Sequence, residues 1–474
     1  MRLVVNNWKL LLFVLPIAVF LVFRLYSIHT SLLFFNDMGR DFSVLLDWYE
    51  SGKPPLLGPQ TSAFSFNQSA FYFYLLFPAF LLTNHSAFSS IYTVIFCYLL
   101  AFLFGIWIYR NDKTKLVSLW LVGLLVTLQP QAIIQHRFVW NPSFVLLFMI
   151  IASFAFLEMR HQLNWKNLTA FSLGVAAAIS FNYSALPAVA SLFLVGMFFW
   201  RKKTWLVVVA TSVAGLLLNL PTIFFELRHK FVLTKLLIEG QTLMQVDIGF
   251  WGKMMTLEGY LVGYKGWVGV VISLLLMALI VVGLQIYWKR KQHAQFRSLL
   301  SLSLASLICF VLTFILPFNI ESHYIFGLMS LLIMTMALLP LQLVLFVALL
   351  SLLWLLPIFT KRYFLPARRT VADMQTCYRD FCDKNRQPLY VSMQSGILPY
   401  HNAPEHRFLM REAGCKVLNI EDNQDQSRQM AVVVDDSKYE HGKTAYNELT
   451  LFGQSSVGEE YHCTEKLQII LLKK

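Results

Sequence analysis

The sequence predicts a polytopic α-helical membrane protein with a small soluble α/β domain at its C-terminal end. Of its 474 residues, 57% are hydrophobic and only 14% are charged, and the mean hydropathy is +0.58. Long uncharged apolar runs recur up to about residue 360, after which the composition becomes charged and mixed. A large soluble protein does not have this composition.

Apolar runs cover residues 10–23, 87–109, 116–130, 143–157, 168–200, 204–225, 266–288, 298–318 and 324–359. A membrane-spanning helix needs about twenty residues. The runs 168–200 and 324–359 are therefore expected to hold two helices each, with breaks near Asn182 and at Pro340. The sequence predicts about eleven spans in total. Residues 70–82 are too few to cross a membrane and predict an interfacial or re-entrant helix.

Basic residues indicate how these spans are oriented. They cluster around residues 110–115, 160–166, 201–203 and 289–297, and all four clusters are cytoplasmic if the N-terminus is cytoplasmic. These loops also account for the net charge of +13 without a nucleic-acid partner. The basic residues that begin at Lys361 disagree with this count, which places the C-terminal domain outside. One helix over 324–359 would reverse that placement, but it would be far longer than the bilayer core is thick.

Two domains are expected, a transmembrane domain over 1–360 and a soluble α/β domain over 361–474. Short β-branched and aliphatic runs at 389–392, 431–434 and 467–472 predict strands of the second domain. This domain contains four of the six cysteines: Cys377, Cys382, Cys415 and Cys463. They could form two disulfides if the domain faces an oxidising space. Their spacing does not match a C-x-x-C metal or redox motif.

An acidic motif opens the predicted outer loop over 29–69. Residues 37–41 read Asp-Met-Gly-Arg-Asp. In a helix, Asp37 and Asp41 would lie on one face with Arg40 beside them. A carboxylate there could take a proton from a hydroxyl group while the cation offsets phosphate charge. The alternative is a solvated ion pair without a chemical role.

Other polar residues are predicted on the same outer side of the membrane. They lie in segments 135–137, 140–142, 182–183, 226–229, 258–265 and 321–324. A site at the boundary of water and lipid could be assembled from such helix ends. No P-loop, G-x-G-x-x-G, H-E-x-x-H or G-x-S-x-G motif occurs. Apart from Arg24, the apolar runs carry no ionisable residue in their middle parts. An ion-coupled transporter usually needs such residues, so this class is disfavoured.

The motif at 37–41, the segments 53–62, 70–82 and 137–143, and the pair at 323–324 resemble the GT-C membrane glycosyltransferases. The likeness is to the branch of protein O-mannosyltransferases and aminoarabinose transferases, and it is most specific over residues 30–143. It implies a GT-C fold, a polyprenyl-phosphate sugar donor, and transfer with inversion at the outer membrane face. It also implies that Asp37 is the base, supported by Asp41 and Arg40. Many relatives have a second acid where this chain has Met38.

The leaving phosphate of such a donor would need cations. Arg137 or Arg228, with His323, could supply them, and Tyr324 could contact the substrate. Their alternative roles are structural: a snorkelling Arg137, an interfacial Arg228, and belt residues at 323–324. No metal ligand is assigned, and dependence on a divalent metal is left open.

Three functions remain to be separated. The first is a transferase of the cell or plasma membrane with a glycan, lipid or protein acceptor. The second is a non-catalytic transporter or flippase of lipid-linked glycans, which would tolerate substitution of Asp37. The third is an envelope-assembly protein whose tail recruits partners. The position of the acidic motif favours the first.

Overall fold

The computed structural model describes residues 2–61, 67–238, 249–263, 266–315, 320–359, 364–367, 369–395, 402–423, 425–442 and 447–474. These residues form two compact units that interleave along the chain. The first unit comprises Met1–Leu25, Pro55–Leu76 and Ile91–Ile358. The second comprises Tyr26–Pro54, Phe77–Ser90 and Phe359–Lys474.

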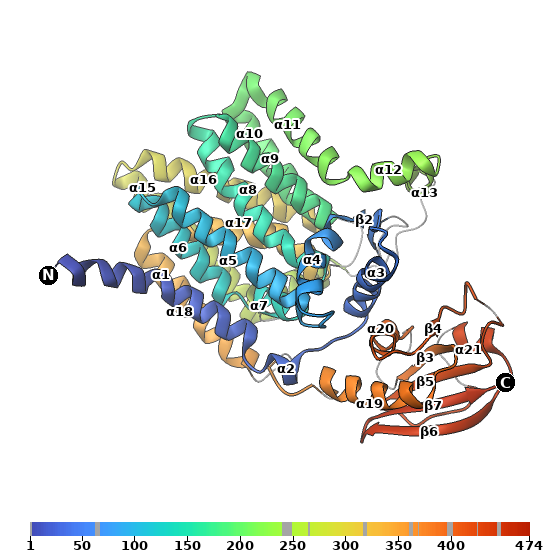
Figure 1. Ribbon diagram of the computed structural model, residues 1–474. Coiled ribbons are helices and arrows are strands. Elements are labelled where there is room, and N and C mark those ends of the chain that lie inside the picture. The colour runs from blue at the N-terminus through green and yellow to red at the C-terminus, as the bar shows by residue number, and fades with distance from the viewer. Residues whose placement is uncertain are drawn as a thin grey trace. The chain divides into compact units, whose positions relative to one another are not determined.

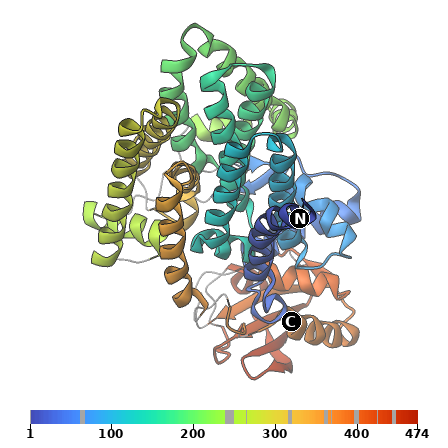
Figure 2. The same cartoon turned by 90° about the vertical axis from the view of Figure 1, so that its left-hand side faces the viewer.

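The first unit is a bundle of helices, which Figure 1 labels and Figure 2 shows turned by 90°. Its longer helices are α1 (Arg2–Leu25), α5 (Ser89–Tyr109), α6 (Lys113–Leu128), α8 (Val145–His161), α9 (Trp165–Phe181), α10 (Leu186–Trp200), α11 (Thr204–Leu218), α15 (Trp267–Lys289), α16 (His293–Phe314) and α18 (Leu341–Phe359). Shorter elements are α7 (Pro130–Arg137), α12 (Leu220–Arg228), α13 (Val232–Ile238), α14 (Phe250–Val262), α17 (Phe326–Ala337) and the hairpin β1 (Leu57–Gln60) with β2 (Asn67–Ser69).

The predicted helix breaks are confirmed. Helix α9 ends at Phe181, and the Asn182 side chain then accepts a hydrogen bond of 2.9 Å from the backbone N–H of Ser184. This bond starts a new helical segment, as an N-cap does. Pro340 stands between α17 and α18, where its missing N–H and its ring interrupt the helix. The short helix expected at 70–82 is α4 (Phe71–Leu82).

The count of eleven spans is not confirmed. Among the described residues, six helical segments are long and apolar enough to cross a membrane, or seven if the bent pair α6 and α7 is one span. The other predicted runs also form helices, but several are short: α9 has 17 residues and α17 has 12. These lengths lie at or below the lower end of what a bilayer core of about 30 Å requires.

The second unit contains a five-stranded sheet of order β4-β3-β5-β7-β6 (Figure 1). In chain order its C-terminal part is α19 (Val371–Lys384), β3 (Leu389–Ser395), α20 (Pro404–Glu412), β4 (Val417–Leu418), β5 (Gln429–Asp435), α21 (Asn447–Phe452), β6 (Ser456–Thr464) and β7 (Leu467–Lys473). Strands β4, β3 and β5 are parallel, whereas β7 and β6 are antiparallel to their neighbours. The three predicted strands are thus present. The unit also includes α2 (Ile28–Ser31), α3 (Asp37–Ser51) and the end of α4.

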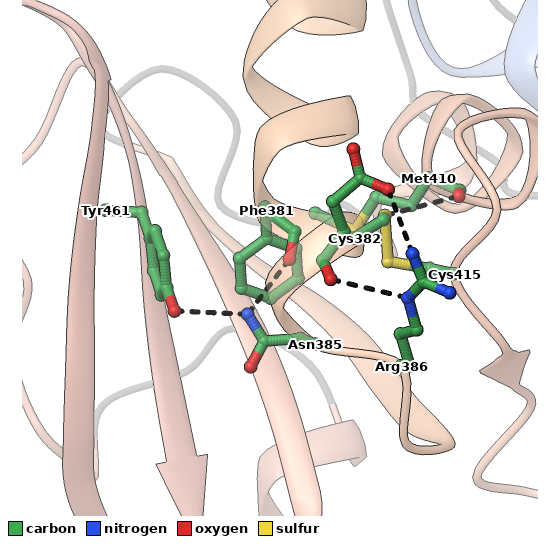
Figure 3. Close-up of a disulfide and its surroundings, with 8 residues drawn as sticks. Phe381, Cys382, Asn385, Arg386, Met410, Cys415 and Tyr461 are labelled. Carbon is green, nitrogen blue, oxygen red and sulfur yellow. Dashed lines mark hydrogen bonds and ion pairs between the residues drawn. A yellow bond between two sulfur atoms is a disulfide. The ribbon is translucent and has the colours of Figure 1, made fainter.

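Two disulfides connect the elements of this sheet region. Cys377 of α19 pairs with Cys463 of β6, and Cys382 of α19 pairs with Cys415 after α20. Figure 3 shows the second bond with Asn385, whose Nδ2 atom donates to the phenolic oxygen of Tyr461 at 3.1 Å. Helix α19 is therefore covalently fixed both to the sheet edge and to α20.

Peptide mapping without reduction tests this pairing. We expect the linked peptides Cys377–Cys463 and Cys382–Cys415. Cys309 is buried and should react with an alkylating agent only after unfolding, whereas the half-buried Cys97 should react more readily. Any other connectivity among the four cysteines would contradict the fold of this region.

Candidate functional site

The acidic motif forms the first turn of α3. Arg40 lies between the two aspartates: its Nη1 atom is 2.7 Å from Oδ1 of Asp37, and its Nη2 atom is 2.7 Å from Oδ1 of Asp41. Nε of Arg40 donates to the same Asp41 oxygen at 2.8 Å. The expected arrangement, with both acids on one helical face and the arginine beside them, is confirmed.

The two acids have different surroundings. Asp41 is fully buried, whereas the side chain of Asp37 is 25% exposed and that of Arg40 is 36% exposed. Asp37 is the first residue of α3, where the positive end of the helix dipole stabilises a carboxylate. Asp37 is therefore the acid that a substrate could reach, and Asp41 holds Arg40 in place from within.

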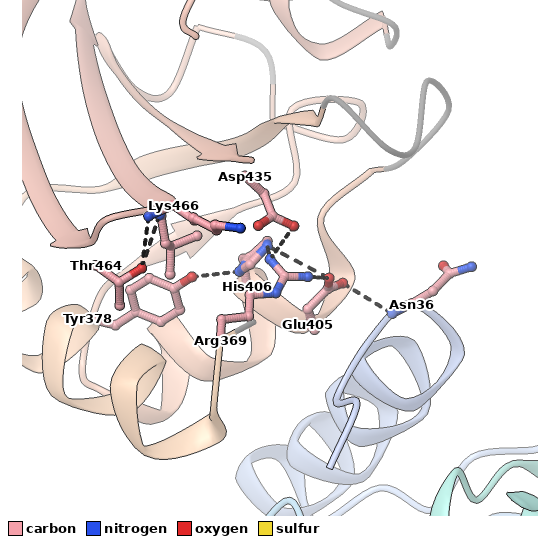
Figure 4. Close-up of polar contacts among 9 residues, drawn as sticks. Asn36, Arg369, Tyr378, Glu405, His406, Asp435, Thr464 and Lys466 are labelled. Atoms are coloured by element: carbon pink, nitrogen blue, oxygen red, sulfur yellow. Dashed lines mark hydrogen bonds and ion pairs between the residues drawn. The ribbon is translucent and has the colours of Figure 1, made fainter. Parts of the chain in front are cut away.

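The residue before the motif has an unusual backbone conformation. Asn36 adopts φ 42° and ψ −104°, a region that is costly for a residue with a side chain. Its N–H donates to Oε2 of Glu405 at 3.2 Å (Figure 4). Glu405 is fully buried in the first turn of α20, so this hydrogen bond anchors the start of α3 to the C-terminal fold.

Gly39 allows α3 and α20 to approach each other at backbone distance. A Cβ atom at this position would overlap the backbone N and Cα of Glu405 and would lie 2.6 Å from the carbonyl carbon of Pro404. These are backbone atoms, which cannot rotate away as a flexible side chain can. The glycine of the motif is thus required by helix packing, independently of any chemistry.

Further contacts join the same two helices. The ring of Phe42 lies 5.3 Å from that of Phe408, at a steep angle that favours edge-to-face attraction. The Nη2 atom of Arg411 is 2.7 Å from a carboxylate oxygen of Asp47 and 2.6 Å from one of Glu50, and both acids lie on α3. The motif therefore belongs to a helix that is fixed along its length by residues of the C-terminal region.

A buried polar network lies behind this contact (Figure 4). Arg369 is 3.0 Å from Glu405 and 3.2 Å from Asp435, and its Nη1 atom is 2.8 Å from Nε2 of His406. The other ring nitrogen of His406 is 2.6 Å from the hydroxyl of Tyr378. Burial raises the pKa of Glu405, and the Arg369 guanidinium acts in the opposite direction. The network compensates charges that would otherwise be buried at high cost.

In the first unit, Arg24 of α1 is fully buried and connects three helices. Its Nη1 and Nη2 atoms donate to the carbonyl oxygens of Thr127 at 2.8 Å and Val126 at 3.0 Å. These carbonyls belong to the last turn of α6, which has no intrahelical donors for them and carries the negative end of the helix dipole. Nε of Arg24 donates to Nδ1 of His136 on α7 at 3.2 Å. Arg24 therefore fixes the 68° bend between α6 and α7.

Arg137 follows His136 and is also buried. Its Nη1 atom donates to the carbonyl oxygens of Phe23 at 3.3 Å and Arg24 at 3.2 Å, at the end of α1. Arg137 thus ties α7 to α1. Its predicted contact with a donor phosphate stays a prediction.

The remaining predicted site residues also lie in or beside the first unit's helix ends. The His323 ring is 4.6 Å from that of Trp140 and 4.2 Å from that of Tyr324. Ser184 donates to the His323 carbonyl oxygen at 3.2 Å. The predicted outer segments 140–142 and 321–324 therefore meet, together with Ser184, the residue that follows the predicted segment 182–183. Arg228 is exposed at the C-terminal end of α12 and is not part of this group.

Sequence reasoning missed several residues that support the motif. Glu405, Arg369 and His406 carry no local pattern that marks them, because their partners are far away in the chain. Arg24 had a signal: it is an ionisable residue in an apolar run. Within the described part of the chain, no group of three or more His, Cys, Asp or Glu side chains could hold a metal ion.

No family model matches the chain, and no curated protein matches it either. The resemblance to GT-C glycosyltransferases therefore stays a prediction.

Substitution Gly39→Ala should separate α3 from α20. We expect the second unit to lose about 1–3 kcal/mol of stability, the usual range for overpacking, and to become sensitive to protease near α3. Thermal unfolding and limited proteolysis of the full chain would measure this. Gly215→Ala is the matched control, because nothing lies within 4 Å of a Cβ added to that helical glycine. Equal behaviour of the two variants would contradict the close packing.

Substitution Arg24→Met should destabilise the first unit, because it leaves buried carbonyl oxygens of α6 unsatisfied at about 1–3 kcal/mol each. Arg24→Lys should be intermediate, since an ammonium group keeps the charge but not the planar fork. Unfolding temperatures in detergent would measure both. The exposed Arg201→Met serves as control, and an unchanged unfolding temperature for Arg24→Met would refute the assigned role.

Proposed function

We propose that this chain is a membrane glycosyltransferase that moves a monosaccharide from a polyprenyl-phosphate donor to an acceptor hydroxyl group. The observation that carries the proposal is the state of Asp37: a partly exposed carboxylate, fixed at a helix start and paired with Arg40 at 2.7 Å. Such a group is positioned to accept a proton, and the adjacent guanidinium offers charge compensation to a phosphate.

In the proposed reaction, a carboxylate oxygen of Asp37 takes the proton of the acceptor hydroxyl. The acceptor oxygen then forms a bond to the anomeric carbon of the donor while the bond from that carbon to the phosphate oxygen breaks. The electron pair leaves with the polyprenyl phosphate, and attack from the opposite side inverts the configuration. The chemistry needs no other reactant.

Arg40 has two proposed tasks. Its Nη1 atom orients Asp37, and its exposed part can meet negative charge from a bound substrate. The buried Asp41 keeps the guanidinium in register through Nε and Nη2. A fixed cation of this kind is effective because it does not have to reorganise as charge develops. The donor contacts of Arg137, Arg228, His323 and Tyr324 are part of the same proposal.

Placement on the extracytoplasmic side has support from the cysteines. Both disulfides lie in the unit that also contains the motif. Disulfides persist in oxidising compartments and are rare in the cytosol of mesophiles. The basic loops of the first unit give the same orientation by an independent route. Both arguments favour an integral protein of the cell or plasma membrane with Asp37 outside.

Substitution Asp37→Asn should lower transfer by about 10²–10⁴-fold, the usual contribution of a general base, while donor binding is retained. Membranes that contain the protein would be supplied with radiolabelled polyprenyl-phosphate sugars and a crude envelope extract as acceptor source. Label in a new acceptor would be counted. Asp47→Asn is the control, because Asp47 lies on the same helix and also pairs with an arginine, Arg411, at 2.7 Å.

Full transfer by the Asp37→Asn protein would refute the assignment of the base. A transporter of lipid-linked glycans, the alternative from another class, predicts that labelled donor changes membrane side without a new glycosidic bond. Reducing-end analysis of the labelled product separates the two results.

A further inference from the structure

A long groove crosses the first unit between α1, α5, α6, α8 and α9. Its volume is about 1180 Å³, which exceeds the roughly 300–1,000 Å³ of pockets for drug-sized ligands. Apolar side chains line most of it, including Phe20, Leu119 and Phe148. The groove is therefore suited to an extended hydrocarbon chain and not to a compact polar molecule.

One end of the groove has a different character. It is lined by Trp107 of α5, by Arg110 directly after α5, and by Trp165 and Lys166 at the start of α9. The two tryptophans are 59% and 72% exposed, as is typical of residues at the membrane–water boundary. The guanidinium carbon of Arg110 lies 5.3 Å from the Trp107 ring, and the Lys166 ammonium lies 5.8 Å from the Trp165 ring. Each cation is thus held over an aromatic face at the mouth.

The charges at this end do not cancel. Lys115 lies 2.8 Å from Glu158 and 3.7 Å from Asp112, so this one cation serves both acids of the lining. Within the part of the chain that the structure describes, Arg110 and Lys166 form no ion pair with a carboxylate. Both line the groove, Arg110 as the residue that follows α5 and Lys166 from the first turn of α9, and both belong to segments predicted to be cytoplasmic.

We propose that this groove binds an anionic phospholipid, with the headgroup between Arg110 and Lys166 and one hydrocarbon chain along the apolar walls. Basic pockets between transmembrane helices on the cytoplasmic side are established binding places for anionic headgroups. The aromatic rings add contact area for the upper part of the chain. The proposal is independent of the glycosyltransferase assignment, because none of these residues belongs to the acidic motif or its support.

Native mass spectrometry of the full chain, purified in detergent, tests the headgroup. Phosphatidylglycerol and phosphatidylcholine with identical chains would be titrated separately, and glycerol phosphate would be added as a headgroup without a chain. We expect retention of phosphatidylglycerol in preference to phosphatidylcholine and no competition by glycerol phosphate. Arg110→Gln with Lys166→Gln should weaken phosphatidylglycerol binding by about thirtyfold, as expected for the loss of two interfacial cations.

The control for charge is Arg201→Gln with Lys202→Gln, which removes two exposed cations from another basic loop that does not line the groove. This control should bind as the unchanged protein does. Equal retention of both lipids, or equal loss in both double variants, would overturn the headgroup site.

The variant Ala170→Trp tests whether the hydrocarbon chain of the lipid lies in the groove. Ala170 lines the groove on α9, so a large ring there should block the hydrocarbon path. Ala210→Trp on α11 is the matched control, since it adds the same ring outside the groove. Both variants must show the unfolding temperature of the parent. If the folded Ala170→Trp protein binds phosphatidylglycerol as well as the parent does, the hydrocarbon chain does not lie in this groove and the proposal is wrong. Competition by glycerol phosphate would show that the site binds simple anions instead.

Discussion

The direct backbone contact between α3 and α20 at Gly39 determines where the acidic motif lies. No side chain other than hydrogen fits between the two helices at this point. Once the helices meet there, the other contacts follow in register: Asn36 reaches Glu405 at one end, and Arg411 reaches Asp47 toward the other. The costly conformation of Asn36 is stabilised by its hydrogen bond to Glu405 and by the close packing of α3 on α20.

Three buried charged side chains of the described residues are compensated by local partners, and each arrangement restricts the geometry around it. Asp41 is paired through one oxygen with two nitrogens of Arg40, Arg369 is paired with two carboxylates, and Arg24 with carbonyl oxygens at the end of a helix. Removing a charged side chain from water costs several kcal/mol, so each arrangement tolerates little displacement. Asp37 differs from these groups because part of its side chain remains in water. It is the acid of the motif that solvent reaches.

Local patterns were sufficient for some features and not for others. Helix breaks at Asn182 and Pro340 follow from capping and from the missing proline N–H, and the helical spacing of the motif follows from its sequence. The contact of Gly39 with Glu405 joins residues more than 360 positions apart, and nothing near either residue indicates the other. Four cysteines allow three connectivities, and only the fold selects one. The count of eleven spans is not confirmed, because hydropathy finds apolar runs but not where each helix begins and ends.

The acidic motif and the C-terminal region belong to the same compact unit, and this limits which roles the C-terminal region can have. A recruiting tail would need no contact with the loop after the first helix. Here α3 packs on α20, and the same unit buries Glu405 and Asp41. A general base must be held within a fraction of an ångström of its working position by groups that do not themselves move. The sheet, its two disulfides and the Arg369 network supply such a support for the start of α3. Under the proposed function, the C-terminal region would therefore position Asp37.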